Sequence, residues 1–118
     1  MKKFTAIAID DDKVFLTILQ KLVNSIRFVE LVETHTNPVS GALAVVNLEP
    51  DFLFLDVEMP YVDGFETIEM LKHRPKTIVI SSHESSHESV QMIKPDAFIS
   101  KPIHKEELEE ILLRLSEE

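Results

Sequence analysis

The sequence predicts an α/β fold in which five parallel β-strands carry helices on both faces. Apolar strand-like runs alternate five times with segments of helical periodicity, the order typical of strand–helix units joined by right-handed crossovers. The run 52–55 is continuously apolar, as expected for a strand covered on both faces. Several runs end abruptly on a polar residue. We therefore predict one doubly wound domain over residues 1–118, with no linker and no internal repeat.

Two strand–helix units precede the run 52–55. The predicted strands are 4–9, which ends at three consecutive aspartates, and 29–34. Asn37 is a predicted N-cap, and Pro38 follows it at the first helical position. The first helix has apolar residues at spacing four, with two more beside them: Val14, Ile18, Leu22 and Ile26, with Leu19 and Val23. The residues expected to form the apolar face of the second helix are Val39, Leu43 and Val46, with Ala42 nearby.

The second half continues the alternation. The strand 52–55 ends at Asp56, the strand 77–80 ends at Ser81, and the strand 97–99 is followed by Lys101. Gly64 is expected in the turn before a third helix, and Pro95 is expected to stop a fourth helix. The apolar positions of the third and fourth helices are Phe65, Ile68 and Leu71, then Val90 and Ile93. The last helix has its apolar residues on one side: Leu108, Ile111, Leu112 and Leu115.

Composition excludes several classes of protein. The chain has no cysteine, which excludes a disulfide framework and thiolate chemistry and fits a reducing compartment. The formal net charge of −9 argues against direct nucleic-acid binding, because phosphate backbones attract positive surfaces. No apolar run reaches the roughly 20 residues of a membrane helix, and the N-terminus lacks the pattern of a secretory signal. We therefore expect a cytoplasmic domain that contacts neither membrane nor nucleic acid.

Polar residues gather where the predicted strands end. These residues are Asp10, Asp11, Asp56, Ser81 and Lys101. Ligands of open parallel sheets bind at the carboxyl ends of the strands, so these side chains are expected to converge. Three neighbouring carboxylates repel one another unless a cation lies among them, and oxygen ligands that leave room for water suit Mg²⁺. A carboxylate beside such an ion, with an amine and a hydroxyl opposite, is well arranged to attack phosphorus.

Each of these residues also has an ordinary structural explanation. An aspartate after a strand often caps the next helix, and capping is the interpretation we favour for Asp12. Ser81 alone would be an ordinary cap, and Lys101 alone an ordinary surface lysine. Capping does not explain why the whole set falls on one edge in this order.

With these residues in view, the full chain resembles the CheY-like receiver domains of two-component response regulators. The matching segments are 9–11, the Asp-x-x-Met-Pro-x-x-Asp-Gly pattern that starts at Asp56, Ser81 after an apolar strand, and Lys101-Pro102. The resemblance implies a flavodoxin-like sheet with strand order 2-1-3-4-5. It also implies a phosphorylation switch that accepts a phosphoryl group from a histidine kinase or a histidine phosphotransfer protein.

The resemblance also implies a role for each matching position. Asp56 would be the phosphoacceptor, and Lys101 would contact the phosphoryl group, with the bond to Pro102 in the cis form. Ser81 and Phe98 would be the switch pair that remodels the surface of the fourth helix, fifth strand and last helix, which contacts an output partner or forms a homodimer. The implied ligands of Mg²⁺ (or Mn²⁺) are Asp11, Asp56, the backbone carbonyl of Glu58, and Asp10 directly or through water.

Some positions depart from the commonest family pattern. Ser81 replaces a more frequent threonine, Ser82 a smaller residue, and Phe98 a common tyrosine; Glu58 and His83 occupy variable positions near the acceptor. Segments 27–32 and 37–38 are most similar to receivers that precede a LytTR-type DNA-binding domain. In that case the chain is the receiver part of a longer regulator.

Residues 83–87 read His-Glu-Ser-Ser-His, the H-E-x-x-H pattern of zinc metallopeptidases. The pattern requires a helix and a third ligand, whereas here it starts in a serine-rich loop. A solvated loop that leads into a helix is the interpretation we favour, with Ser85 and Glu88 at capping-box spacing.

Two other functions stay open at this level. Asp10, Asp12, Ser81 and Lys101 loosely match the motifs of haloacid-dehalogenase-type phosphatases, but that fold generally needs a longer chain and gives Asp56 no role. A pseudo-receiver would be an interaction module that is never phosphorylated. We expect a phosphoacceptor switch that catalyses only its own phosphorylation and dephosphorylation.

Overall fold

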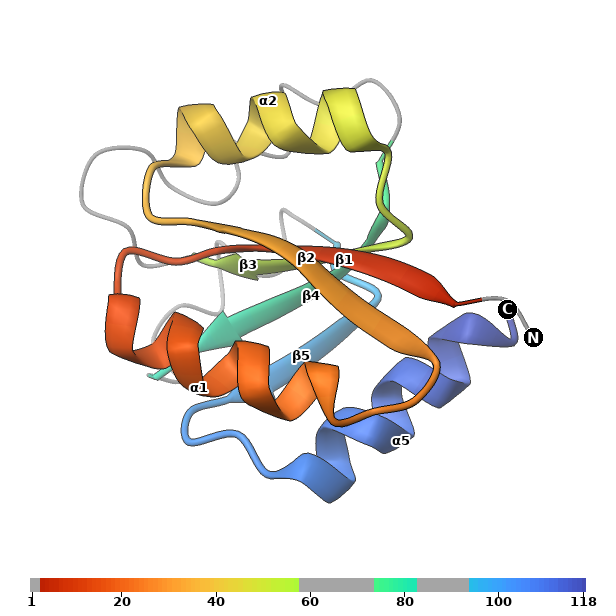
Figure 1. Cartoon of the computed structure of the whole chain (residues 1–118). Helices are drawn as coiled ribbons and strands as arrows, with labels where there is room; N and C mark the ends of the chain where they lie inside the picture. The colour runs from red at the N-terminus through yellow and green to blue at the C-terminus, as the bar shows by residue number, and fades with distance from the viewer. Residues whose placement is uncertain (1–2, 58–73, 83–93) are drawn as a thin grey trace.

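The computed structural model describes residues 3–57, 74–82 and 94–118, and these form a five-stranded parallel sheet with helices on both faces (Figure 1). The strands lie in the order β2-β1-β3-β4-β5, which confirms the predicted topology. The strands are β1 (Phe4–Ile9), β2 (Val29–His35), β3 (Phe52–Asp56), β4 (Lys76–Ser81) and β5 (Ala97–Ser100). The described helices are α1 (Lys13–Asn24), α2 (Pro38–Leu48) and α5 (Lys105–Ser116). The predicted third and fourth helices and the segment 83–87 lie outside the described residues.

Alternate residues of the sheet supply two separate cores. Phe52 and Phe54 of β3 face the layer formed by α1 and α5, whereas Leu53 and Leu55 face the layer that contains α2. This alternation follows from the two-residue period of a strand. All four side chains are at most 1% exposed, so β3 is covered on both faces, as its continuous apolar sequence predicts.

The N-termini of the first two helices are capped as the sequence predicts. The side chain of Asp12 accepts hydrogen bonds from the backbone N–H groups of Val14 and Phe15, and Asn37 caps α2 ahead of Pro38 at its first turn. Each cap satisfies N–H groups that have no partner within the helix. The start of each helix is therefore fixed relative to the strand before it.

The predicted buried face of α1 is partly wrong. Val14 and Ile18 are 71% and 50% exposed, whereas Leu19 and Val23 are buried together with two residues outside the predicted stripe, Phe15 and Leu16. Apolar residues surround most of this helix, so spacing alone fits two neighbouring stripes. The helix also ends at Asn24, before Ile26.

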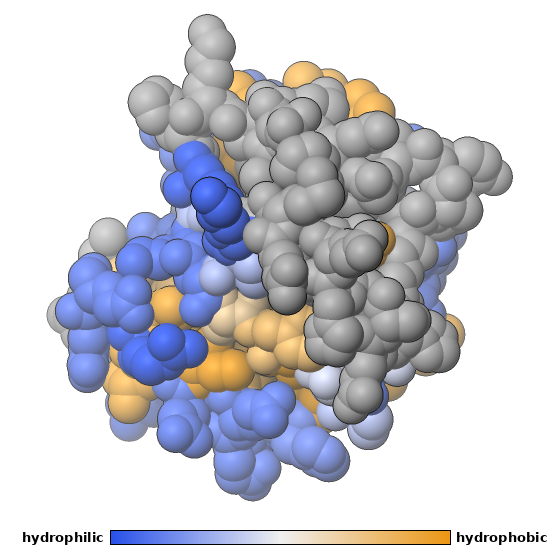
Figure 2. Space-filling model, turned by 180° about the vertical axis from the view of Figure 1, so that it is seen from behind, coloured by the Kyte–Doolittle hydropathy of each residue, from blue (hydrophilic) through white to orange (hydrophobic). Residues whose placement is uncertain are grey.

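The predicted apolar face of α2 is the face that solvent reaches. Val39, Leu43 and Val46 are 48%, 58% and 56% exposed. Figure 2 shows hydrophobic atoms at the top of the molecule, which is the end where α2 lies in Figure 1. The helix has no charged residue to mark an outer side. The face that packs on the sheet is made mainly of small residues: Pro38, Gly41, Ala42, Ala44 and Val45.

Gly41 explains why the small face is the one that packs. A Cβ atom at position 41 would lie 2.5 Å from Cγ1 and 2.6 Å from Cδ1 of Ile9 in β1. Only glycine allows this approach without a shift of the neighbouring atoms, so α2 lies close to the sheet.

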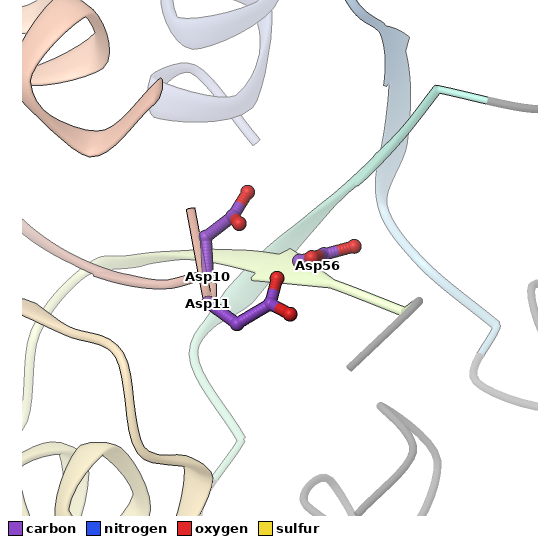
Figure 3. Close-up of side chains that lie close together, drawn as sticks. All are labelled: Asp10, Asp11 and Asp56. Atoms are coloured by element: carbon purple, nitrogen blue, oxygen red, sulfur yellow. The ribbon is translucent and has the colours of Figure 1, made fainter. Parts of the chain in front are cut away.

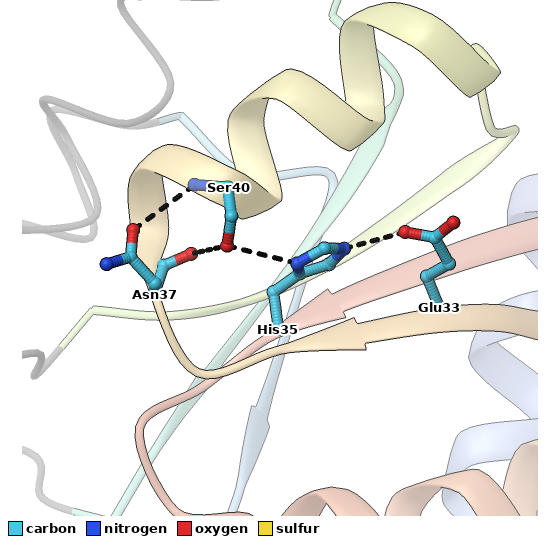
Figure 4. A network of polar contacts seen from close by, with 4 residues as sticks. All are labelled: Glu33, His35, Asn37 and Ser40. Carbon is cyan, nitrogen blue, oxygen red and sulfur yellow. Dashed lines mark hydrogen bonds and ion pairs between the residues drawn. The ribbon is translucent and has the colours of Figure 1, made fainter.

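A polar network joins β2 to the start of α2 (Figure 4). In His35, Nε2 lies 2.8 Å from Oε1 of Glu33, and Nδ1 lies 3.1 Å from Oγ of Ser40. The Ser40 hydroxyl donates to the backbone carbonyl of Asn37 at 3.1 Å. These contacts fasten the turn between β2 and α2.

Candidate phosphoacceptor and metal site

The predicted polar residues lie at the carboxyl edge of the sheet. Asp10 follows β1, Asp56 ends β3, Ser81 ends β4 and Lys101 lies just beyond β5. All strands run parallel, so four separate segments of the chain deliver side chains to the same edge. Asp10, Asp56 and Ser81 are 1%, 3% and 1% exposed, which is unusual for polar groups at a sheet edge.

Three carboxylates form an acidic cluster at this edge (Figure 3). One carboxylate oxygen from each of Asp10, Asp11 and Asp56 lies within 4.8 Å of the other two. Asp11 is exposed, whereas the other two are buried. The cluster is therefore open to solvent on the Asp11 side.

This acidic cluster has the chemistry of a divalent cation site. Carboxylates at this separation repel one another, and burial weakens the screening by water. Oδ2 of Asp10 is buried and accepts no aligned hydrogen bond from the described residues. A cation near these oxygens would offset the repulsion, and an open side leaves room for the water ligands that Mg²⁺ usually keeps.

The turn after β1 is held by a short series of hydrogen bonds. The backbone N–H of Asp12 donates to Oδ1 of Asp10 at 2.8 Å, and Oδ1 of Asp12 accepts from the N–H of Phe15 at 3.1 Å. Asp12 therefore serves as a helix cap, as predicted, and its side chain is not part of the acidic cluster. The same bonds orient the Asp10 carboxylate toward the site.

Lys101 supplies the positive charge of the site. Its Nζ lies 3.0 Å from Oδ2 of Asp10, and the two side chains are 21% and 2% exposed. The backbone N–H of Lys101 donates to the carbonyl of Ser81 at 3.0 Å, which fastens the segment after β5 to the end of β4. The Lys101–Pro102 peptide bond is cis.

One contact of the site was not predicted from the sequence. Nζ of Lys101 lies 4.2 Å from the centroid of the Phe15 ring, within the range of a cation–π interaction. Phe15 is 8% exposed and belongs to the core between the sheet, α1 and α5. The apolar stripe predicted for α1 does not include Phe15, whereas the stripe that is buried begins with this residue.

The remaining predicted positions are only partly described. Ser81 is buried, and Phe98 lies on β5, opposite Val79 in the strand register, with 39% of its surface exposed. Glu58 lies outside the described residues. Among the predicted site residues, the structure brings together Asp10, Asp11, Asp56 and Lys101.

Comparison with known proteins agrees with this arrangement. Residues 6–113 match the response regulator receiver domain family. The chain belongs to that family. Receiver domains are phosphoacceptor switches of two-component systems, and they pair with histidine kinases and output domains.

Two relatives illustrate the range of whole proteins that contain such a domain. The chain is 32% identical over 114 residues to the transcriptional regulatory protein BtsR of Escherichia coli K12, covering 93% of this chain and 47% of the relative. It is 36% identical over 83 residues to a protein-glutamate methylesterase/protein-glutamine glutaminase of Bdellovibrio bacteriovorus, covering 69% of this chain and 23% of the relative. The chain thus spans about half the length, or less, of these relatives.

Solved structures support the fold. The response regulator domain of Thermotoga maritima CheB superimposes with a TM-score of 0.81 at 21% identity, covering 98% of both chains. The signal receiver domain of NarL from Mycobacterium tuberculosis gives a TM-score of 0.86 at 18% identity, covering 99% of this chain and 98% of that one.

In the described part of this chain, no helix has the length and apolar character needed to cross a membrane.

Proposed function

We propose that this receiver domain accepts a phosphoryl group on Asp56 and releases it slowly, and that it acts as a switch without turning over an external substrate. The observation that carries the proposal is the buried Asp56 carboxylate within 4.8 Å of two further carboxylates, at the edge where Lys101 forms an ion pair with Asp10. A buried nucleophile beside a lysine and a cation-binding cluster is suited to phosphoryl transfer, in which positioning and charge dominate.

In the proposed step, a carboxylate oxygen of Asp56 attacks phosphorus, and the bond from phosphorus to the donor breaks. With a phosphohistidine donor this is the P–N bond, and its electron pair returns to the imidazole. The product is an acyl phosphate on Asp56. Attack by water on the phosphorus later breaks the new O–P bond, which releases inorganic phosphate and restores the carboxylate.

The donor set fits a hard divalent ion such as Mg²⁺ or Mn²⁺. The proposed ligands are the carboxylates of Asp11 and Asp56 and the backbone carbonyl of Glu58, with Asp10 binding directly or through water. When bound, the ion neutralises charge on the transferring phosphoryl oxygens. Lys101 would offset charge on the same group, and the Ser81 hydroxyl would donate a hydrogen bond to it.

The proposed switch involves Ser81 and Phe98. The ring of Phe98 is 39% exposed, and in the proposed switch it moves inward when the Ser81 hydroxyl moves to the phosphoryl group. That movement would change the surface around β5 and α5, together with the helix expected before β5. This surface would contact the output partner or a second copy of the chain.

The proposed partners follow from the family and from its whole proteins. A sensor histidine kinase or histidine phosphotransfer protein would supply the phosphoryl group to this domain in the cytoplasm. The similarity to BtsR, which covers 47% of that protein, favours a transcriptional output, carried by a separate DNA-binding domain such as one of the LytTR type. The domain itself, residues 1–118, has a net charge of −9 and is proposed to contact neither DNA nor membrane.

Beryllofluoride titration tests the proposal, because this anion mimics a phosphoryl group on a carboxylate. In amide NMR spectra with Mg²⁺, the wild-type chain should show shifts at Ser81, Phe98 and Lys101, whereas Asp56→Asn should show none. Asp12→Asn is the matched control, since asparagine still caps a helix, and it should respond like the wild type. A wild-type chain that gives no Mg²⁺-dependent response would be a pseudo-receiver. Repeated turnover of a phosphomonoester would instead indicate a phosphatase.

A further inference from the structure

The aromatic ring of Phe15 lies beneath the charged end of Lys101. Nζ of Lys101 is 4.2 Å from the ring centroid, well inside the limit of about 6 Å for a cation–π interaction. Phe15 is 8% exposed and is part of the core, so packing fixes the ring. The lysine therefore meets a rigid surface of negative electrostatic potential.

The same ammonium group has a second contact, with Asp10. Nζ lies 3.0 Å from Oδ2 of Asp10, but this oxygen accepts no aligned hydrogen bond from the residues that the structure describes. Charge attraction without hydrogen-bond geometry sets a distance but not a direction. The ring of Phe15 supplies a second contact that restricts the direction of the ammonium group. Because the Lys101 side chain is only 21% exposed, water competes little for these contacts.

Both contacts originate in one turn of the chain. The N–H of Asp12 donates to Asp10, and the side chain of Asp12 accepts from the N–H of Phe15. The carboxylate and the ring that face Lys101 are therefore fixed relative to each other by the cap of α1. A shift of this turn would move both.

We propose that Phe15 is a positioning residue for Lys101: its ring holds the ammonium group beside Asp10 at the carboxyl edge of the sheet and prevents it from turning into solvent. This inference rests on the proposed function, in which Lys101 meets the phosphoryl group. An aliphatic residue at position 15 would fill the core but would lack the negative face of an aromatic ring.

Phosphorylation rates with acetyl phosphate and Mg²⁺ test the role in the full chain. Phe15→Leu should be phosphorylated about fivefold more slowly, which corresponds to about 1 kcal/mol, whereas Phe15→Tyr keeps a ring face and should stay close to the wild-type rate. Phe52→Leu is the matched control. Phe52 is 1% exposed in the same core and packs on Phe4 at the opposite end of the sheet, so its variant should lose stability without losing rate.

NMR tests the contact between Lys101 and Phe15 independently of phosphorylation. The ε-methylene protons of Lys101, assigned by their loss in Lys101→Arg, should be shifted upfield by the Phe15 ring current in the wild type. They should move to ordinary lysine positions in Phe15→Leu and return upfield in Phe15→Tyr. The wild-type spectrum decides this point even if Phe15→Leu fails to fold.

The two proposals fail in different ways. Unshielded Lys101 protons in the wild type, or an unchanged phosphorylation rate in folded Phe15→Leu, overturn the positioning role. Shielded protons in a wild-type chain that accepts no phosphoryl group overturn the proposed function and support the contact.

Discussion

The ammonium group of Lys101 lies 3.0 Å from the carboxylate of Asp10, although β3 and β4 separate the strands that precede these two residues. The backbone N–H of Lys101 is bonded to Ser81 at the end of β4, and from there the side chain places its charge beside the acidic cluster of Asp10, Asp11 and Asp56. The positive charge of Lys101 offsets part of the repulsion among these three carboxylates, which lie within 4.8 Å of one another. The ion pair therefore links the stability of the domain to the chemistry of the site.

Lys101→Met should lower the free energy of unfolding in metal-free buffer. Asp10 would keep a buried charge without its partner, which typically costs 3–5 kcal/mol in a fully buried pair. Because the Lys101 side chain is 21% exposed, we expect a smaller loss of about 2 kcal/mol, measured by urea denaturation.

Lys76→Met is the matched control for that loss. Nζ of Lys76 lies 3.4 Å from Glu118, but these side chains are 36% and 48% exposed, so the change should be at most about 0.5 kcal/mol. Equal losses in the two variants would show that the Lys101–Asp10 pair has no special role.

Mg²⁺ should raise the thermal stability of the domain. An ion that binds only the folded state, at about ten times its Kd, stabilises that state by about 1.4 kcal/mol. Asp11→Asn removes one member of the acidic cluster and should reduce the increase in Tm on adding Mg²⁺. Asp12→Asn keeps the helix cap and should leave the increase unchanged; an equal reduction in both variants would contradict a site formed by Asp11.

The sequence allowed the strands, the helix caps and the polar edge to be predicted, because each depends on local signals. An apolar run that stops at an aspartate identifies both a buried strand and its end, and Asp12 and Asn37 occupy cap positions with the expected geometry. The topology also follows, since parallel strands joined by helices permit few arrangements.

The buried faces of α1 and α2 could not be predicted in the same way. Both helices are apolar around most of their circumference, so periodicity does not show which side meets the sheet. In α2 the choice depends on a contact between Gly41 and Ile9, which are distant in the sequence. Phe15 could not be predicted as a site residue either, because its contact with Lys101 joins two residues that are distant in the sequence.

Side-chain truncations in α2 should show which face of the helix packs on the sheet. Leu43→Ala removes a side chain that is 58% exposed and should change the free energy of unfolding by about 0.5 kcal/mol or less. Val45→Ala removes a side chain that is 3% exposed and should cost about 2 kcal/mol. Urea denaturation measures both. A larger loss of unfolding free energy for Leu43→Ala than for Val45→Ala would indicate that the face predicted from the sequence is the one that packs on the sheet.

Gly41→Ala should destabilise the domain although alanine favours helices. Relief from glycine alone would add up to about 1 kcal/mol of stability. The new Cβ would instead lie 2.5 Å from Cγ1 of Ile9, and such overpacking usually costs about 1–3 kcal/mol. A double-mutant cycle with Ile9→Ala should show favourable coupling, because that change removes the clashing atoms; a gain in stability for Gly41→Ala alone would rule out the close packing.

Site-specific mass spectrometry after phosphorylation tests the central claim most directly. The chain is treated with acetyl phosphate and Mg²⁺, and borohydride then reduces any acyl phosphate to an alcohol that survives digestion, which converts a phosphorylated aspartate to homoserine. We predict homoserine at position 56 only when Mg²⁺ and the phosphodonor are both present. Modification at Asp10 or Asp11 with Asp56 unmodified, or equal labelling without a divalent ion, would contradict the account.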